Sequence, residues 1–567
     1  MRWLIFVCAA CSTSSELASV DPGRIAAHVH ELADEIGPRP GDSPASRAAA
    51  AYIASQVPGI ERFDVGGVDL PAIDVLGVHW RDAHHLDTTD PDLLVHFGPP
   101  GKALLVTAHY DTVPGSPGAV DDGASVALLI ELARTWREHP PAQPVVLAFT
   151  ANEERGLVGA EALAERRGDD IAFAIALDLV GGTGPLVLNG ASTLIREPEL
   201  RWIAAAADRA GIWLRAPLPH RVISRWWPQA ERADHGAFTR RGIRGVHFYN
   251  RGQDGEWIDL AYHSPGDVAS RVDRDSVLEV GRVLQALADS PVPEPGGRDG
   301  FWLPLAQNTV VPRWTLLVVE LVLAALALAV LVSFARNRPS RSRGAGLVAG
   351  LVCFAVAVAL AIAAERAFAG AHPAPWLHAP LRAELAETGV LVGVLGLATR
   401  LVARRWPWKG ERRYLAIAIA LPLAIGGACL AVGAAELAWV WLVPAALAAL
   451  APRLGRAAVL ALAASVLPAV LVLAPAQLRE ASWNGFLPVA LPLAAWLALF
   501  LAPPLALSAW LARRRGAGPL GTLVLPVGCG LAVVAGLAGL AIAPPFICSA
   551  REFQHFHLAC EVAATWR

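Results

Sequence analysis

The sequence predicts an α/β domain followed by an all-α domain that spans a membrane. Short apolar runs alternate with helical patterns over residues 20–290, which is typical of strands and helices packed in layers. From residue 315 onward, apolar runs of about 20 residues recur, which is the length that crosses a bilayer. Residues 1–312 hold 27 Lys and Arg against 41 Asp and Glu, whereas residues 313–567 hold 21 against 9. These contrasts exclude a wholly soluble protein, a disordered chain and a nucleic-acid binder with a basic groove.

The N-terminus is expected to target the chain for export. The chain begins with a positive charge at Met1-Arg2, continues with an apolar stretch to Cys11, and then has a short polar stretch rich in serine. Residues 1–19 therefore resemble a signal sequence or an N-terminal anchor. No cysteine lies between residues 12 and 352, so the α/β domain has neither a disulfide nor a thiolate metal site.

Apolar runs that end at polar residues predict the strands of the α/β domain. We expect strands at Leu93–Phe97, Ala103–Ala108, Val145–Thr150, Phe173–Leu177, Leu186–Leu188 and Val246–Tyr249. Helical spacing of apolar residues predicts helices at Ala124–Glu138, Glu197–Ala210 and Asp273–Ala288. Ligands of open α/β sheets bind outside the carboxyl ends of the strands, so functional residues are expected there. Residues 291–314, which begin with a Pro- and Gly-rich stretch, are interpreted as a linker into the membrane.

Eight membrane spans are predicted between residues 315 and 543. They lie near 315–335, 344–364, 385–403, 414–435, 437–452, 457–475, 486–511 and 520–543. The odd-numbered connections carry 15 Lys and Arg, against three in the even-numbered ones. Since basic loops stay in the cytoplasm, the α/β domain and the tail 544–567 are expected on the extracytoplasmic side of a cell membrane. Glu320 is the one ionisable group well inside a run, so an anchor is favoured over a transporter.

Two clusters of ionisable residues directly follow predicted strands. His109-Tyr110-Asp111 comes after the strand 103–108, and Glu153-Glu154 comes soon after the strand 145–150. A histidine at a strand end can bind a metal while a nearby Asp orients it, although this pair taken alone is better explained by a surface histidine that has a hydrogen-bond partner. Of two adjacent glutamates, one can bind a cation while the other acts as a base on water.

Three further clusters complete the set. Asp121-Asp122 precedes the helix 124–138, where N-terminal capping accounts for Asp122, while the Gly-rich approach indicates that Asp121 points elsewhere. Asp178 ends the strand 173–177, and His263 lies in a predicted turn. His, Asp and Glu without Cys are typical of a catalytic zinc site. Two histidines and three carboxylates, one of them shared, suffice for the two divalent ions of a two-metal hydrolase.

The order of these motifs resembles that of the M28 family of zinc peptidases, which includes bacterial dizinc aminopeptidases. The motifs are His109-x-Asp111, Gly-Ala-Val-Asp121-Asp122-Gly-Ala-Ser, Glu153-Glu154-x-Gly-Leu-x-Gly, Leu-Asp178-Leu, Asp234-His235-x-x-Phe and Tyr-His263-Ser-Pro-x-Asp. The resemblance covers roughly residues 85–290 and implies a mixed, mostly parallel sheet with helices on both faces. With its multi-spanning C-terminal half, the chain further resembles endoplasmic reticulum metallopeptidases and fungal vacuolar membrane proteases.

The resemblance also implies a role for each matched residue. Asp121 bridges two zinc ions; His109 and Asp178 complete one site, while Glu154 and His263 complete the other. Asp111 orients His109, Glu153 is the general base and acid, and a cis peptide joins Asp121 to Asp122. The implied reaction is removal of a residue from a peptide or protein N-terminus.

Three alternatives remain open from the sequence alone. Glutaminyl cyclases resemble this family but use one zinc, and Tyr262 stands where we associate those enzymes with Trp. A receptor-like domain keeps the scaffold without the metals, although this chain has all the matching ligands. In the third alternative, the membrane domain transports a substrate and the peptidase domain is an accessory.

Overall fold

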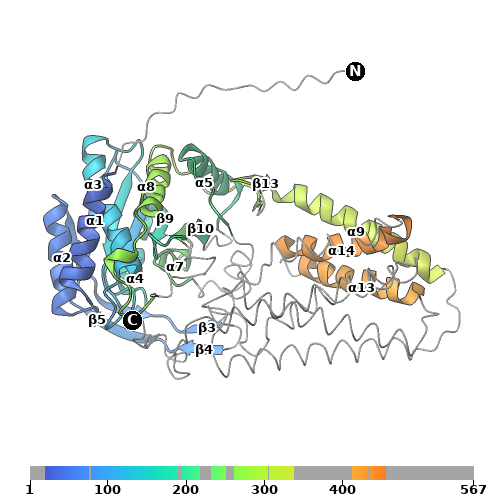
Figure 1. Cartoon of the computed structure of the whole chain (residues 1–567), viewed down its shortest axis with the longest axis horizontal. Coiled ribbons are helices and arrows are strands. Elements are labelled where there is room, and N and C mark those ends of the chain that lie inside the picture. Colours follow the sequence, from blue (N-terminus) through green and yellow to red (C-terminus); the bar gives the residue numbers. More distant parts are fainter. Residues whose placement is uncertain are drawn as a thin grey trace, which may run out of the picture.

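The computed structural model describes residues 20–75, 78–189, 194–216, 231–250, 261–303, 306–336, 411–431 and 435–454. The predicted signal segment, the tail and the spans near 344–364, 385–403, 457–475, 486–511 and 520–543 lie outside these residues. The described part comprises the α/β domain and three long helices beyond it (Figure 1).

A seven-stranded mixed sheet forms the centre of the α/β domain, in the order β1-β6-β8-β7-β9-β11-β10. The strands are β1 (Glu61–Phe63), β6 (Asp92–Phe97), β7 (Ala103–His109), β8 (Val145–Thr150), β9 (Ile171–Leu177), β10 (Leu186–Asn189) and β11 (Gly245–Asn250). Each of the six predicted strands is confirmed within two residues at either end. Strands β7 and β8 are buried along their whole length, which explains their continuous apolar runs.

The middle of the sheet is parallel. Strand β7 pairs in parallel with β8 on one side and with β9 on the other, and β9 pairs in parallel with β11. Strands β1, β6 and β10 are antiparallel to their neighbours. The carboxyl ends of β7, β8 and β9 therefore meet at one edge of the sheet.

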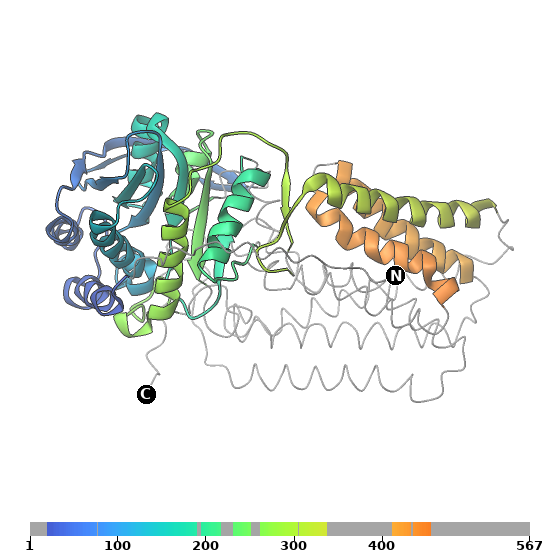
Figure 2. The same ribbon diagram turned by 90° about the horizontal axis from the view of Figure 1, so that it is seen from above.

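Helices cover both faces of the sheet (Figure 2). They are α1 (Pro22–His30), η1 (Glu31–Ile36), α2 (Pro44–Gln56), η2 (Ala119–Gly123), α3 (Ala124–Glu138), α4 (Val158–Arg167), η3 (Gly168–Asp170), α5 (Glu197–Arg209), α7 (His235–Thr239), η6 (Ala269–Arg271) and α8 (Arg274–Ala288). The chain moves from β7 to β8 through α3 and back across β7 to β9 through α4. Because such crossovers are right-handed, α3 and α4 lie on opposite faces. The predicted helices at 124–138, 197–210 and 273–288 are confirmed as α3, α5 and α8.

Short strands outside the main sheet were not predicted. Two small hairpins precede β6, formed by β2 (Gly66–Leu70) with β5 (His84–Thr88) and by β3 (Ile73–Val75) with β4 (Val78–Arg81). A third pairs β12 (Gly300–Trp302) with β13 (Val310–Pro312), within the predicted linker. The linker is therefore partly folded.

The third hairpin joins the α/β domain to the first long helix, α9 (Arg313–Arg336). Trp302 and Val310 belong to the core of the α/β domain. Phe301 points the other way and packs against Leu316 of α9 and Trp439 of the helix α14 (Ala435–Leu454). The hairpin thus contacts both parts of the molecule.

Helices α9, α13 (Glu411–Ala431) and α14 pack side by side, at the positions of three predicted spans (Figures 1 and 2). Within the described ranges, one helix is long and apolar enough to cross a membrane, at Arg313–Ser333. Shorter apolar helical stretches occur at Pro422–Ala431 and Trp441–Leu450. Glu320 is buried in this bundle and lies 2.9 Å from the guanidinium of Arg313, one partner that the sequence analysis did not foresee.

Candidate metal centre at the carboxyl edge of the sheet

Four predicted ligands converge beyond the ends of β7 and β8. His109 is the last residue of β7, and Asp121 lies in the turn η2 that leads into α3. The Nε2 atom of His109 lies 3.2 Å from Oδ1 of Asp121. The other oxygen of Asp121 lies 3.1 Å from Nε2 of His263, so one carboxylate is shared between two imidazoles.

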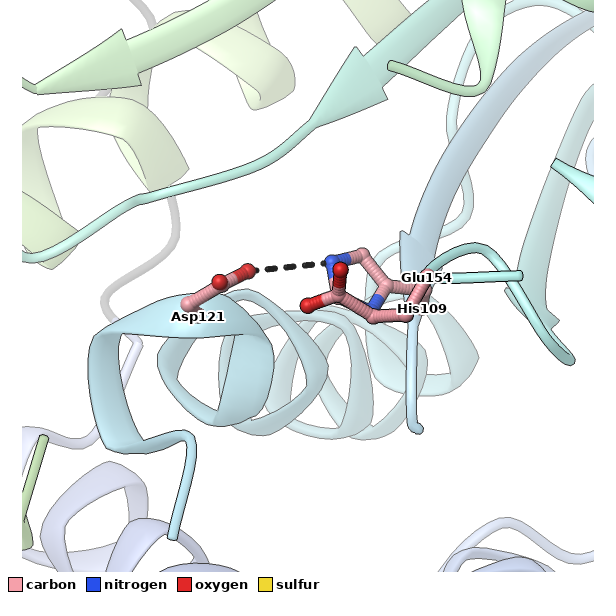
Figure 3. A group of neighbouring side chains, drawn as sticks. All are labelled: His109, Asp121 and Glu154. Carbon is pink, nitrogen blue, oxygen red and sulfur yellow. Dashed lines mark ion pairs between the residues drawn. The ribbon is translucent and has the colours of Figure 1, made fainter. Parts of the chain in front are cut away.

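Glu154 closes this group from the loop after β8. Its Oε1 atom lies 3.1 Å from Nε2 of His263, in the turn before η6. Ligand atoms of His109, Asp121 and Glu154 all lie within 4.8 Å of one another, and Figure 3 shows the three side chains pointing at a common space. His109, Asp121 and His263 are buried, and the Glu154 side chain is 11% exposed.

The donor set fits a divalent cation. Among the described residues, Oε1 of Glu154 has no hydrogen-bond partner, although the imidazole of His263 is close. Oε1 of Glu154 and Nε2 of His263 lie close together without a hydrogen bond between them, which is the arrangement expected of two atoms that bind the same ion. Collecting carboxylates away from water is costly, and a bound cation offsets that cost.

The electrostatics of the cluster favour positive charge at its centre. Burial opposes ionisation of His263, but Glu154 and Asp121 outweigh it and raise its pKa to about 10. Burial likewise opposes ionisation of Asp121, yet His109 and His263 hold the pKa of its carboxyl group well below the usual range. Burial and the neighbouring Asp121 raise the pKa of Asp178 to about 7. Asp178 directly follows β9, and the effect of the Asp121 charge on its pKa indicates that it lies near the cluster.

Glu153 and Asp111 lie beside these ligands. Burial raises the pKa of Glu153 well above its usual value, and Glu154 and Asp178 add to the effect. The carboxylate of Asp111 accepts backbone hydrogen bonds from Glu153 (3.0 Å) and Glu154 (3.2 Å). It lies 3.7 Å from Nδ1 of His109, whereas the backbone carbonyl of Asp111 lies 3.1 Å from that nitrogen. Asp111 therefore contacts both loops of the cluster, and its carboxylate chiefly fixes the Glu153–Glu154 turn.

The approach to α3 differs from simple capping. The bond between Asp121 and Asp122 is cis, as the family resemblance implied. The carboxylate of Asp122 accepts a hydrogen bond from the hydroxyl of Ser125, and α3 has no side-chain cap. The predicted capping role of Asp122 is therefore wrong. The motif Asp234-His235 lies next to the cluster, since the Asp234 carboxylate accepts the Thr150 hydroxyl (2.6 Å) at the end of β8.

Comparison with known proteins gives a family for the α/β domain. The description Peptidase family M28 matches residues 95–288. Those residues form a peptidase M28 domain.

Named relatives match part of the chain. Aminopeptidase YwaD of Bacillus subtilis is 27% identical over 193 residues, which is 32% of this chain and 40% of that protein. Vacuolar membrane protease of Clavispora lusitaniae is 29% identical over 179 residues, covering 31% of this chain and 15% of the relative. The chain thus spans less than half the length of these relatives. Among solved structures, a zinc aminopeptidase from Bacillus subtilis is 16% identical with a TM-score of 0.39, covering 48% of this chain and 95% of that one.

Two residues at the M28 site were given no role from the sequence. Arg39 is fully buried beneath the loop that carries Asp121, and Asp267 accepts backbone hydrogen bonds from that loop. Asp267 belongs to the final motif, which is a signal that could have found it. Arg39 precedes the matched region. It donates to the nearby carbonyls of Leu32 and Gly37, but its partners beside the site are 71 to 79 positions away, so no local pattern pointed to a role there.

Proposed function

We propose that this protein is a membrane-anchored zinc metallopeptidase that removes residues from the N-terminus of peptides or proteins. The observation that carries the proposal is the meeting of His109, Asp121, Glu154 and His263 at the carboxyl edge of an M28 sheet. These residues come from four separate segments of the chain, namely the end of β7, η2, the loop after β8 and the turn before η6, so their proximity is a property of the fold rather than of local sequence. Histidine and carboxylate ligands without cysteine are typical of catalytic zinc.

In the proposed site, Asp121 would be shared by two zinc ions. His109 and Asp178 would complete one site, and Glu154 and His263 would complete the other. The two oxygens of Asp121 face different imidazoles, which supports a bridging role. Zinc bound there would polarise a peptide carbonyl and lower the pKa of a bound water towards ~7.

Glu153 is the proposed general base and acid. It takes a proton from the attacking water and returns it to the leaving amine. A carboxyl whose pKa is raised by burial suits a group that must both accept and release a proton near neutral pH. Asp111 fixes the backbone of Glu153 and Glu154, so that one glutamate can bind metal while its neighbour remains free for proton transfer.

We further propose that the M28 domain is held at an extracytoplasmic membrane surface. The apolar helix Arg313–Ser333 and relatives named vacuolar membrane protease support membrane association. The multi-spanning topology and the orientation rest on the apolar runs and on the distribution of basic residues. The ion pair between buried Glu320 and Arg313 gives Glu320 a structural role, which favours an anchor over a transporter.

Activity of the full-length chain tests the proposal. The protein, purified in detergent micelles and supplied with zinc, is incubated with aminoacyl-p-nitroanilides and with peptides that begin with glutamine. We expect release of p-nitroaniline, and we expect Glu153→Gln to lower kcat by about 10²–10⁴-fold because proton transfer is lost. Glu165→Gln is the matched control, since Glu165 is an exposed glutamate on α4.

Other outcomes have distinct meanings. Formation of pyroglutamate, with no amino acid released, would favour the glutaminyl cyclase alternative. No turnover of any substrate by a zinc-loaded chain would contradict the proposed function and favour a receptor-like domain.

A further inference from the structure

We propose that Arg39 and Asp267 form a buried brace that holds the loop carrying Asp121 and thereby sets the affinity of the site for zinc. The loop is residues 117–123, called here the Asp121 loop. The inference rests on the proposed function, because it concerns how tightly the same site binds metal. Neither residue is itself a candidate ligand; both act as positioning residues through the backbone.

Arg39 holds the Asp121 loop by its carbonyl groups. Its side chain is fully buried, and its Nη2 atom donates to the carbonyl of Gly118 (2.8 Å) while Nη1 donates to Pro117. Its Nε atom donates to the carbonyl of Tyr110 (2.7 Å), directly after His109. One rigid guanidinium thus joins the backbone beside His109 to the backbone that leads into Asp121, and the planar fork of arginine suits such multiple contacts.

Asp267 holds the same loop by its amide groups. The carboxylate is buried and accepts hydrogen bonds from the backbone N–H of Val120 (2.8 Å) and of Asp121 itself (3.1 Å). The backbone carbonyl of Asp267 accepts a third, from Ala119 (3.1 Å). Because Asp267 comes four residues after His263, these bonds tie the His263 turn to the Asp121 loop.

The glycines of the Asp121 loop allow this close approach. A Cβ atom on Gly118 would lie 2.5 Å from the carbonyl oxygen of Asp121 and 3.3 Å from Nη2 of Arg39. Gly118 also has a φ of +61°, a conformation that favours glycine. A Cβ atom there would also lie 2.3 Å from Cγ2 of Thr112, so the backbone conformation of Gly118 and the close packing around it explain this glycine of the Gly-rich approach.

Charge gives the brace a second effect. Burial lowers the pKa of Arg39 to about 10, while Asp267, Asp111 and Asp121 oppose that change. Arg39 therefore remains protonated at neutral pH and offsets part of the negative charge of the carboxylates behind the metal ligands. A neutral side chain of similar length loses both the carbonyl contacts and this charge.

A purely structural role is the competing explanation, and Arg244 provides the matched control. Arg244 is also buried, and it donates to Glu199 and to the carbonyls of Pro293 (2.7 Å) and Ala172 (3.2 Å). It precedes β11, whereas the metal cluster lies beyond the opposite ends of the parallel strands. Arg244→Met should therefore lower stability without altering the metal site.

The test measures zinc affinity separately from stability, on the full-length chain in detergent micelles. Zinc binding is titrated in competition with a chromophoric chelator, and the unfolding temperature is recorded without zinc. We expect Arg39→Met and Asp267→Asn each to weaken zinc binding by about 10–100-fold, the usual effect of residues that support metal ligands. Arg39→Lys should fall between Arg39→Met and the wild type, because an ammonium group can still donate to one carbonyl of the loop but cannot reach all of the carbonyls that the guanidinium contacts. Arg244→Met should keep the wild-type zinc affinity while its unfolding temperature falls.

Two results would overturn the inference. If Arg39→Met and Asp267→Asn fold and bind zinc as tightly as the wild type, the brace has only a structural role. If Arg39→Met does not fold, the near-isosteric Asp267→Asn decides the question alone. A wild-type chain that binds no zinc would instead overturn the proposed function, and the brace with it.

Discussion

Replacing Asp111 with asparagine tests how the turn that carries both glutamates is held. The Asp111 carboxylate accepts two backbone N–H groups, those of Glu153 and Glu154. Asparagine offers one oxygen acceptor and turns an NH₂ group toward the second amide, so one of the two bonds is lost. A hydrogen bond to a charged group contributes about 1.5–3 kcal/mol, and we expect the free energy of unfolding to fall by about that amount.

The loss should also appear in zinc binding, because Glu154 is carried by the same turn. We expect Asp111→Asn to weaken zinc affinity by about 10–100-fold in a chelator competition titration of the full-length chain. Asp92→Asn is the control. Asp92 is also buried and accepts one backbone bond, from Ala151 (2.9 Å), which asparagine can equally accept. Wild-type zinc affinity in Asp111→Asn would refute the proposed role of the carboxylate.

Three further predictions concern stability and metal removal. Burial raises the pKa of Glu131, but hydrogen bonds from His28, Arg24 and Arg134 outweigh it and lower the pKa to about 2. The ionised carboxylate should therefore stabilise the fold by about 1–3 kcal/mol above pH ~4.5, an effect lost as the pH falls towards 2. Glu131→Gln should remove this stabilisation and lower the unfolding temperature at pH 7. Glu138→Gln, at an exposed position of the same helix, should not lower it. Equal unfolding temperatures for the two variants would contradict this. Gly41→Ala would place a Cβ atom 1.7 Å from Oδ1 of Asn152, so it should displace the loop before Glu153 and lower both stability and kcat. Unchanged values would contradict this and show that the loop can move aside at little cost. Removing zinc with a chelator should lower the unfolding temperature, and zinc at 100 times its Kd should restore about 2.7 kcal/mol for each ion bound. An unfolding temperature that does not depend on zinc would argue against a site in the folded state.

Long apolar runs made the centre of the fold predictable from the sequence. The predicted bounds of β8 and α3 agree with the structure to the residue. Both elements are largely buried, and each begins directly after a residue that breaks regular structure, Pro144 before β8 and Gly123 before α3. Strands β2 and β5 were missed because they form a partly exposed hairpin, and β2 begins with two glycines. Their apolar content is too small for a periodic signal.

The ligand clusters were predictable for a different reason. His109, Glu154 and Asp178 follow three adjacent strands, so a parallel arrangement alone brings them to one edge of the sheet. The supporting contacts were not predictable in the same way. The bonds from Arg39 to the Asp121 loop, and from Asp111 to the Glu153–Glu154 turn, join positions that are 42 to 79 residues apart and depend on exact loop conformation.

Metal content is the most direct test of the central claim that residues from separate segments of the chain form one zinc centre around Asp121. Zinc per chain should be measured by mass spectrometry after the full-length protein is equilibrated with zinc and freed of excess metal. The account predicts two zinc ions in the wild type and fewer in Asp121→Asn, since that carboxylate faces both imidazoles. Equal zinc content in the two proteins, or none in the wild type, would contradict it.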